Sequence, residues 1–464
     1  MSKVDLKNDT IGKLFFYFTF PAVTGMMVSA LYVIVDGIFI GRGIGSSGLA
    51  AINIAYPITN FLVGLSLMFG VGGATMISIA RGKNQTYEVN RIFTHTLFLT
   101  FVVYILALFV VILFEKDVIY FLGGNDLLYK DIRSYLIPSA WFNIFFMLSM
   151  GLNAIVRNDD APKYAMFSMI VGAVINILLD TLFIIVFKWG MWGAAAATGI
   201  AQLCSFIFLM FHFYNGTSDI KIEKKLKLSP IFMGKIIING FPSFIIEFAI
   251  AIVTLLFNLV LMKMTGEIGV AAFSIVAYVF YIFRMIFNGF SQGIQPIVSF
   301  NYGAGRYDRL KKIFYLGHKT SIITALFIIV IVNIFKENIV KVFTDGNEEL
   351  IKLASAGLVC YTSGLIFLAV NFINISYLQS MEKALVSNLM SFGRSFFFVA
   401  AGIFIYPKIF GIYGVFLTPP IADFTVFAIT TVGYFWKKKS GIKEKTYISQ
   451  QQIKSLYLLK KEKL

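Results

Sequence analysis

The sequence repeats itself at a constant offset of 221 residues, and the repeat is clearest at its glycines. Seven glycines of the first half recur at this offset in the second half, together with a proline and an asparagine. A glycine marks a backbone site that needs a close approach or an unusual turn, so recurring glycines indicate recurring structure. The chain is therefore expected to consist of two copies of one structural unit. The glycine pairs are Gly45 and Gly266, Gly48 and Gly269, Gly72 and Gly293, Gly82 and Gly303, Gly172 and Gly393, Gly190 and Gly411, and Gly193 and Gly414.

Apolar segments long enough to cross a bilayer make up most of both copies. Of the 464 residues, 58% are hydrophobic and 14% are charged, and the mean hydropathy is +0.80. At a rise of about 1.5 Å per residue, about 20 residues cross a hydrocarbon core of about 30 Å. The alternating pattern of membrane strands is absent, so the chain is expected to be an all-α integral membrane protein with six transmembrane helices in each half. We place the spans at 14–40, 50–79, 92–114, 132–155, 164–187, 192–214, 235–262, 269–299, 313–335, 352–378, 384–406 and 412–435.

The distribution of basic residues predicts the orientation of these spans. With the N-terminus inside, the inner loops and tails carry about 26 Lys and Arg and the outer loops about 8, which favours cytoplasmic N- and C-termini. The predicted parts are an N-lobe (1–214), a cytoplasmic linker (215–234), a C-lobe (235–436) and a basic cytoplasmic tail (437–464) with spacing for a short interfacial helix. The net charge of +16 therefore favours the bilayer as a partner and not nucleic acid.

Ionisable residues inside the spans are the candidates for chemistry, because a charge at mid-membrane costs about 2.5–3.5 kcal/mol on insertion scales. The acids are Asp36, Asp180, Glu247 and Asp423, and the bases are Arg284 and Arg394. One interpretation is that each acid pairs with an arginine only to hold helices together. For the first two acids this interpretation is weak, because the first half has no arginine deep in a span. Two uncompensated carboxylates indicate a proton, a metal cation or a cationic substrate as the missing charge.

The depth of four polar residues predicts a common site. Asp36, Asp180 and Thr198 lie at similar distances from the outer surface, and Asn176 lies one helical turn deeper than Asp180 on the same face. Two carboxylates, an amide and a hydroxyl provide hard oxygen ligands for a small cation such as Na⁺, or a network that holds a proton. We therefore predict a coupling site for H⁺ or Na⁺ in the N-lobe. The alternative is a structural hydrogen-bond cluster.

Five further residues are candidates for substrate binding or gating. Glu247 is interpreted either as one half of an ion pair with Arg284 or Arg394, or as a contact for a cationic substrate. Asp423 is expected to form a salt bridge with Arg394. Pro21 interrupts the backbone hydrogen bonds of the first span, and bending there is expected to couple the charge of the carboxylates to the shape of the cavity.

Several local sequences, together with the duplication, resemble the multidrug and toxic compound extrusion (MATE) transporters. The resemblance extends from about residue 14 to residue 436 and is closest to the DinF-like and MepA-like branches of that family. The motifs that carry it are Phe20-Pro21, Asp36 to Gly41, Gly48 to Ala51, Asn153 to Pro162 and Asn176 to Asp180.

The resemblance implies a V-shaped pair of pseudo-symmetric six-helix lobes around a central cavity that opens alternately to each side. It implies a cation and proton site at Asp36, Asn176, Asp180 and Thr198. Glu247 is similar to a C-lobe acid of another branch, but the second acid of that branch has no counterpart in the tenth span.

Three functions are compared on this basis. The first is a secondary active exporter of organic, mainly lipophilic cationic, compounds in exchange for H⁺ or Na⁺; the second is a flippase for lipid-linked oligosaccharides. The third is a non-transporting membrane scaffold or channel. We favour the exporter, because a flippase for anionic head groups needs a basic cavity and a scaffold needs no buried acids. The protein is then expected to be no enzyme, to need no cofactor besides the coupling ion, and to act as a monomer in the bacterial inner membrane.

Overall fold

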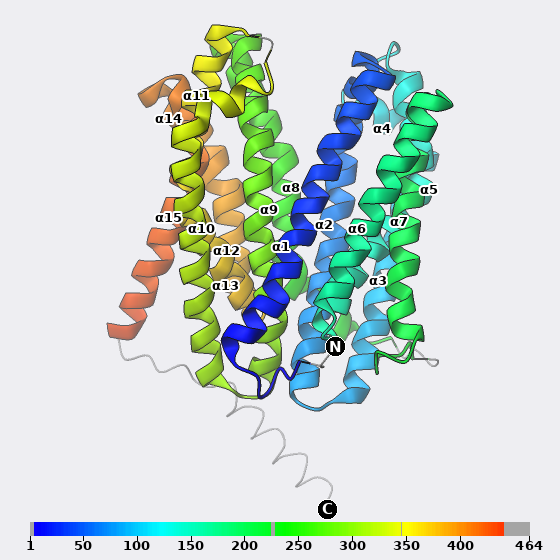
Figure 1. Cartoon of the computed structure of the whole chain (residues 1–464), viewed down its shortest axis with the longest axis vertical. Helices are drawn as coiled ribbons and strands as arrows, with labels where there is room; N and C mark the ends of the chain where they lie inside the picture. Colours follow the sequence, from blue (N-terminus) through cyan, green and yellow to red (C-terminus); the bar gives the residue numbers. More distant parts are fainter. Residues whose placement is uncertain (1–3, 224–227, 345, 440–464) are drawn as a thin grey trace, which may run out of the picture.

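The computed structural model describes residues 4–223, 228–344 and 346–439, and within these ranges it contains helices and no strand (Figure 1). Eleven helices are long and apolar enough to span a membrane, or twelve if one bent pair counts as a single span, which confirms the predicted all-α membrane fold. The first half contains α1 (Ile11–Gly43), α2 (Ser46–Gly82), α3 (Thr86–Leu113), α4 (Glu115–Phe121), α5 (Tyr129–Asn158), α6 (Pro162–Asp180), the π-helix η1 (Thr181–Val186) and α7 (Gly190–Tyr214). The second half contains α8 (Pro230–Thr265), α9 (Glu267–Gly303), α10 (Tyr307–Lys341), α11 (Glu348–Thr362), α12 (Leu365–Gln379), α13 (Ala384–Phe392), the π-helix η2 (Gly393–Phe397), α14 (Phe398–Phe410) and α15 (Ile412–Lys439).

The helix boundaries follow the sequence repeat. Helices α2 and α9 begin and end at positions that differ by 221. Helix α5 corresponds to α11 and α12 together: its end and the end of α12 also differ by 221, whereas α11 begins two residues before the position equivalent to the start of α5. The tenth predicted span is not straight, because α11 and α12 meet at an angle of 44°. At this break Gly364 lies so close to α15 that a Cβ would be 2.5 Å from the Cα of Pro420. The bend therefore occurs where a residue without a side chain allows two helices to touch.

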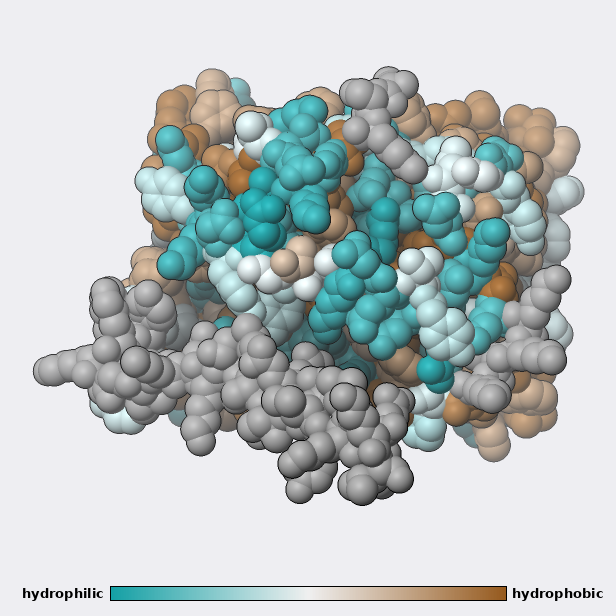
Figure 2. All heavy atoms as spheres, turned by 90° about the horizontal axis from the view of Figure 1, so that it is seen from below, coloured by the Kyte–Doolittle hydropathy of each residue, from teal (hydrophilic) through white to brown (hydrophobic). Residues whose placement is uncertain are grey.

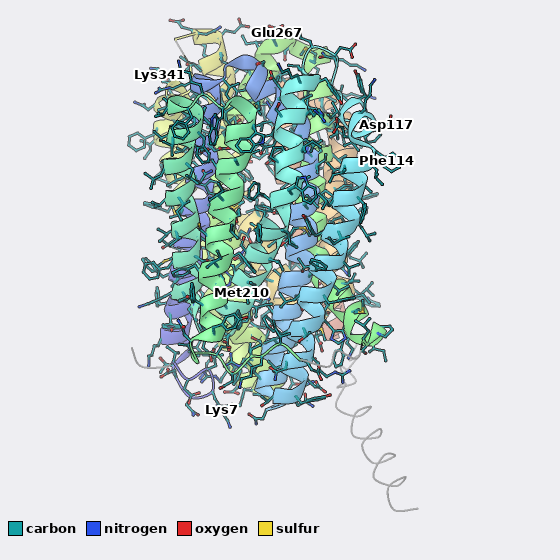
Figure 3. All side chains as sticks on the ribbon, turned by 90° about the vertical axis from the view of Figure 1, so that its right-hand side faces the viewer. Lys7, Phe114, Asp117, Met210, Glu267 and Lys341 are labelled. Carbon is teal, nitrogen blue, oxygen red and sulfur yellow. The ribbon has the colours of Figure 1, made fainter. Side chains whose placement is uncertain are left out.

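The two ends of the helical bundle are distinguished by the segments that they carry. One end, which we call the linker face, carries the start of α1, the turn between α2 and α3, and the linker, and Figure 2 shows that polar residues dominate it. Figure 3 places Lys7 at this end, and Asp117, Glu267 and Lys341 at the other end, which we call the opposite face.

The described part of the linker is tied to α3 by backbone donors. The backbone N–H groups of Lys221 and Glu223 donate to the side chains of Asn90 and Thr94 in α3. Helix α8 begins at Pro230, inside the segment that the sequence assigns to the linker. The interfacial helix predicted in the tail lies outside the described residues.

Helices α1 and α8 each contact both halves of the chain. Near the linker face Phe15 and Phe18 of α1 pack against α9 and α10, whereas Ile40 at its other end packs against α2 and α5. Figure 1 shows this crossing, with α1 beside α9 and α10 at its start and beside α2 and α6 further along. Helix α8 mirrors it, because Ile236 packs among α2 and α3 while Phe257 lies in the core of the C-lobe. The linker-face half of α1 therefore packs on the C-lobe, and the linker-face half of α8 packs on the N-lobe.

Glycines bring α2 and α9 into backbone contact near the linker face. A Cβ added at Gly82 would lie 2.2 Å from the carbonyl oxygen of Phe300, and one added at Gly303 would lie 2.2 Å from that of Ile79. Positions 82 and 303 differ by 221, and so do positions 79 and 300. The contact of Gly82 with Phe300 is therefore equivalent, in the repeat, to the contact of Gly303 with Ile79. The pseudo-two-fold axis between the halves therefore passes through the contact between α2 and α9, which we call the glycine seam.

A second set of close approaches follows the same symmetry. A Cβ at Gly72 in α2 would lie 3.0 Å from the backbone nitrogen of Gly240 in α8, and one at Gly293 in α9 would lie 2.5 Å from the Cα of Thr19 in α1. Thr19 and Gly240 are equivalent in the repeat. All four positions lie in the linker-face half of their helices, so the two lobes are closed against each other on that side.

Candidate functional site

The N-lobe cluster is assembled by three packed helices. Asp36 lies in the half of α1 that packs on the N-lobe, Asp180 is the last residue of α6, and Thr198 lies in α7. Asn176 precedes Asp180 by one turn of α6, so both side chains leave the helix on the same face. Helix α6 contacts both α1 and α7, which brings the four side chains that the sequence grouped by depth into one region.

The cluster is held by few internal hydrogen bonds. Asp180 and Asn176 are 0% and 1% exposed, while Asp36 and Thr198 are half-buried. The amide nitrogen of Asn176 donates to the hydroxyl of Thr198 at 3.3 Å. The carboxyl groups of Asp36 and Asp180 are close enough to interact with each other. The helix changes to a π-helix directly after Asp180, which is an irregularity often found at functional sites.

Four buried oxygen atoms of this cluster have no hydrogen-bond donor in the structure. They are Oδ1 of Asp36, both carboxylate oxygens of Asp180, and Oδ1 of Asn176. Within the described residues neither carboxylate forms an ion pair with a base. Unpaired buried acceptors are costly, so this arrangement fits a site that receives a proton or a small cation from outside the protein.

The acids of the C-lobe have arginine partners. Glu247 lies 3.5 Å from Arg284, which is one of the two partners that the sequence allowed. Asp423 accepts two hydrogen bonds from Arg394, at 2.7 and 3.3 Å, so the expected salt bridge is present. Asn371, which the sequence analysis did not select, donates to the carboxylate and to the backbone carbonyl of Asp423.

Pro21 lies inside the continuous helix α1. It falls between Thr19 and Val23, the two residues of α1 that make the closest contacts with Gly293 and Gly289 of α9. The structure thus places Pro21 at the contact between the lobes, and its role in gating stays a prediction.

The sequence analysis also did not select a polar network at the linker face of the N-lobe as a site. Arg81 pairs with Asp159 at 3.2 Å and with Asp160 at 2.7 Å, and His212 lies 2.8 Å from Asp159. These residues connect the ends of α2, α5 and α7. The available signal was the motif from residue 153 to residue 162, which served only to support the resemblance.

Two pseudo-symmetric six-helix bundles with buried, unpaired carboxylates in one of them define a membrane transporter and not an enzyme. In the part of the chain that the structure describes, no group of three or more His, Cys, Asp and Glu side chains could hold a metal ion. The chain belongs to the MatE family, whose model matches residues 21–182 and 242–404, one match in each half. The predicted resemblance to MATE transporters is therefore confirmed.

Similar proteins agree with this assignment. Over 414 residues the chain is 23% identical to the multidrug export protein MepA of Staphylococcus saprophyticus, covering 88% of this chain and 89% of that protein. The identity to the same-named protein of Staphylococcus aureus is 23% over 423 residues, which cover 90% of this chain and 92% of that one.

Two solved structures have the same fold. One is the MATE multidrug transporter DinF-BH, with a TM-score of 0.86, 29% identity, and coverage of 94% of this chain and 98% of that one. The other is a MATE family transporter in an outward-facing conformation, with a TM-score of 0.88, 20% identity, and coverage of 95% and 98%.

Proposed function

We propose that this protein is a secondary active multidrug efflux transporter that exports organic, mainly lipophilic cationic, compounds in exchange for H⁺ or Na⁺. The observation that carries the proposal is the set of four buried oxygen atoms without donors at Asp36, Asn176 and Asp180. The cationic drug and the coupling ion compete for the negative charge of Asp36 and Asp180, so binding of one favours release of the other. Thr198 completes the oxygen set for Na⁺.

The closed seam supports the direction of transport. The lobes are in contact near the linker face, which the distribution of basic residues assigns to the cytoplasm. In this conformation the coupling ion enters from the outer side, and its binding favours the arrangement of helices that ejects the drug. We infer a multi-pass protein of the cytoplasmic membrane of a bacterium, with both termini inside and acting as a monomer.

A lipid-linked oligosaccharide flippase is the second candidate, and it has less support. It needs basic side chains that are free to bind an anionic head group. Arg284 and Arg394, the two residues that suggested it, each face an acid of the same lobe. Within the C-lobe the charges of these pairs cancel, so no net positive surface results from them.

The test is efflux of a lipophilic cation from proteoliposomes under an imposed proton gradient, and separately under an imposed sodium gradient. Asp36→Asn and Asp180→Asn remove one charge each without changing side-chain volume, and each is expected to abolish gradient-driven efflux. Asp117→Asn, an exposed change in α4, serves as the matched control and is expected to leave efflux intact. Wild-type efflux rates in both cluster variants would remove the N-lobe site from the mechanism.

A further inference from the structure

Three helices of the N-lobe share a row of polar side chains that leads from the N-lobe cluster toward the linker face. Helices α5, α6 and α7 pack against one another in this lobe (Figure 1). In each of them polar residues recur at intervals of three, four or eight residues, which keeps them on one face of the helix. We call these side chains the polar file. Its members are Ser149, Asn153 and Arg157 of α5, Ser168, Asn176 and Asp180 of α6, and Thr198, Gln202 and Ser205 of α7.

Hydrogen bonds join the polar file across the helices. One helical turn from the cluster, the hydroxyl of Ser149 donates to the side chain of Gln202 at 2.7 Å. Closer to the linker face, the backbone carbonyl of Ser168 accepts from the hydroxyl of Ser205 at 3.0 Å. The hydroxyl of the same serine accepts from the amide of Asn153 at 3.1 Å. A connected row of polar groups inside a membrane bundle is a route that a proton or a small cation can follow.

The polar file ends toward the linker face at an arginine. Arg157 lies one residue before the end of α5 and is 3% exposed. Its Nη1 atom donates to Oδ1 of Asn153 at 3.2 Å, and its Nε atom has no hydrogen-bond acceptor in the structure. The sequence analysis ended the fourth span at residue 155, so it did not count this arginine among the bases inside the spans.

No acid forms an ion pair with Arg157 within the described residues. The two acids that follow it in the chain have other partners. Asp159 pairs with Arg81 and His212. Asp160 pairs with Arg81. Because a guanidinium does not lose its proton in proteins, the polar file carries a fixed positive charge at this end.

One end of the polar file is therefore basic and the other end is acidic. Asn153 bonds both to Arg157 and to Ser168, which places the arginine near the start of α6. Asp180 follows Ser168 by 12 residues, which is about 18 Å of helix at about 1.5 Å per residue. In the C-lobe the repeat places Leu378 at the position of Arg157, and the acids there have arginine partners. The fixed positive charge thus occurs in the lobe whose acids are unpaired.

We propose that Arg157 is an electrostatic barrier that stops H⁺ or Na⁺ from passing along the polar file between the N-lobe cluster and the cytoplasm. This inference rests on the proposed export function, in which such an ion binds at the cluster. A cation that moves along the file meets a like charge in surroundings of low dielectric constant, and the two repel strongly. An ion gradient can drive export only if the ion does not cross the membrane without the drug. The barrier therefore keeps ion movement coupled to drug movement.

The test is the flux of ions into proteoliposomes in the absence of any drug. Proton entry is followed with an internal pH-sensitive dye under a potassium diffusion potential, and sodium entry is followed with radioactive Na⁺. Arg157→Gln removes the charge and keeps an N–H donor for Asn153, so it is expected to raise the flux of one of these ions by about tenfold or more. Arg157→Lys keeps the charge and is expected to stay at the wild-type flux. Lys163→Gln, which removes a positive charge from an exposed position at the start of α6, is the matched control and is expected to stay there too.

A second variant removes the net charge without removing the arginine. In Asn153→Asp a carboxylate oxygen takes the place of the amide oxygen that accepts from Arg157, so the guanidinium is neutralised where it lies. This variant is expected to raise the flux as Arg157→Gln does, and it keeps the test valid if that variant misfolds. The double variant Arg157→Gln, Asp180→Asn also lacks the acid at the other end of the file, and it is expected to lose most of the added flux.

Ion flux at the wild-type level in Arg157→Gln and Asn153→Asp, with gel filtration showing folded protein, would overturn the proposal. An equally large flux in Arg157→Lys would also overturn it, because the shape of the guanidinium and not its charge would then close the file. Failure of the export function is distinguishable, because it is measured as gradient-driven drug efflux that persists in Asp36→Asn, whereas the leak is measured without drug.

Discussion

The glycine seam between α2 and α9 makes a quantitative prediction about the conformational equilibrium. In Gly82→Ala the new methyl carbon would lie 2.2 Å from the carbonyl oxygen of Phe300, and in Gly303→Ala it would lie 2.2 Å from that of Ile79. A carbon and a carbonyl oxygen approach to about 3.3 Å, so each methyl group lacks about 1 Å of space. Both obstructing atoms belong to the helix backbone, which cannot rotate away as a side chain can.

The size of the effect follows from this overlap. Overpacking of a tight contact costs about 1–3 kcal/mol. The strain exists only while α2 and α9 are in contact, so it is relieved when the lobes separate at the linker face. Each substitution is therefore expected to shift the equilibrium toward the open linker face by about 5–150-fold. The double variant should add little to either single one, because both methyl groups occupy the same gap once the helices have moved apart.

Distances between spin labels on the linker face measure this shift. Lys83→Cys and Asp308→Cys place labels on exposed positions of the two lobes, after Cys204 and Cys360 have been replaced by serine. Gly234→Ala is the matched control, because it lies in the linker-face half of α8 and a Cβ there meets nothing within 4 Å.

The expected result is a new population at longer distance in Gly82→Ala and in Gly303→Ala, and the wild-type distribution in the control. Distributions identical to the control in both variants would refute the reasoning. They would mean that the helices absorb the methyl groups by local bending and that the seam does not hold the lobes together.

Three other predictions concern the charged residues and the proline. The affinity for a lipophilic cation is expected to fall as external pH is lowered, because protonation removes the negative charge of Asp36 and Asp180. If the pH dependence of this affinity survives intact in the double variant Asp36→Asn, Asp180→Asn, the coupling site lies elsewhere. Pro21→Ala is expected to slow turnover more than it weakens drug binding, since it restores a backbone hydrogen bond at the lobe contact; binding that falls with unchanged turnover would make the proline a packing feature. Asp423→Asn leaves Arg394 buried and unpaired and is expected to cost about 3–5 kcal/mol of stability, which thermal unfolding in detergent checks; an unchanged melting temperature would show that the pair contributes no stability.

The glycine repeat predicted equivalent positions correctly, but not their contacts. Gly45 and Gly266 both have positive φ angles, at 99° and 64°, and both precede a long helix. A repeat in sequence implies such equivalence. It does not say that Gly82 and Gly303 meet, because equivalent residues touch only where they lie on the symmetry axis. That information is contained in the packing of the two copies and not in either copy.

The crossing of α1 and α8 between the lobes was not predictable for a related reason. Both helices are apolar on all faces, so their sequences carry no amphipathic face that selects a neighbour. Packing against either lobe buries similar side chains. The choice depends on the fit of Thr19 and Gly240 against the glycines of the other half.

Depth explains which part of the site could be predicted. The number of residues from a helix end fixes the height of a side chain in the membrane, and this was sufficient to group Asp36 with Asp180. Rotation about the helix axis is not fixed in this way. The sequence therefore left Glu247 with two candidate arginines, and only the packing of α8 against α9 selects Arg284.

The two lobes share a backbone plan but not their charges, and this difference bears on the proposed transport cycle. The position equivalent to Asp36 in the C-lobe is Phe257, which is fully buried in an apolar core. The position equivalent to Glu247 in the N-lobe is Met26. Under the proposed function, a coupling ion bound at the N-lobe cluster would change the electrostatic energy of that lobe. The other lobe would respond through α1, which carries Asp36 at one end and packs on the C-lobe at the other. Because a ligand shifts an equilibrium only through unequal affinity for two states, a helix shared by both lobes is the element through which neutralising one carboxylate can open or close the seam.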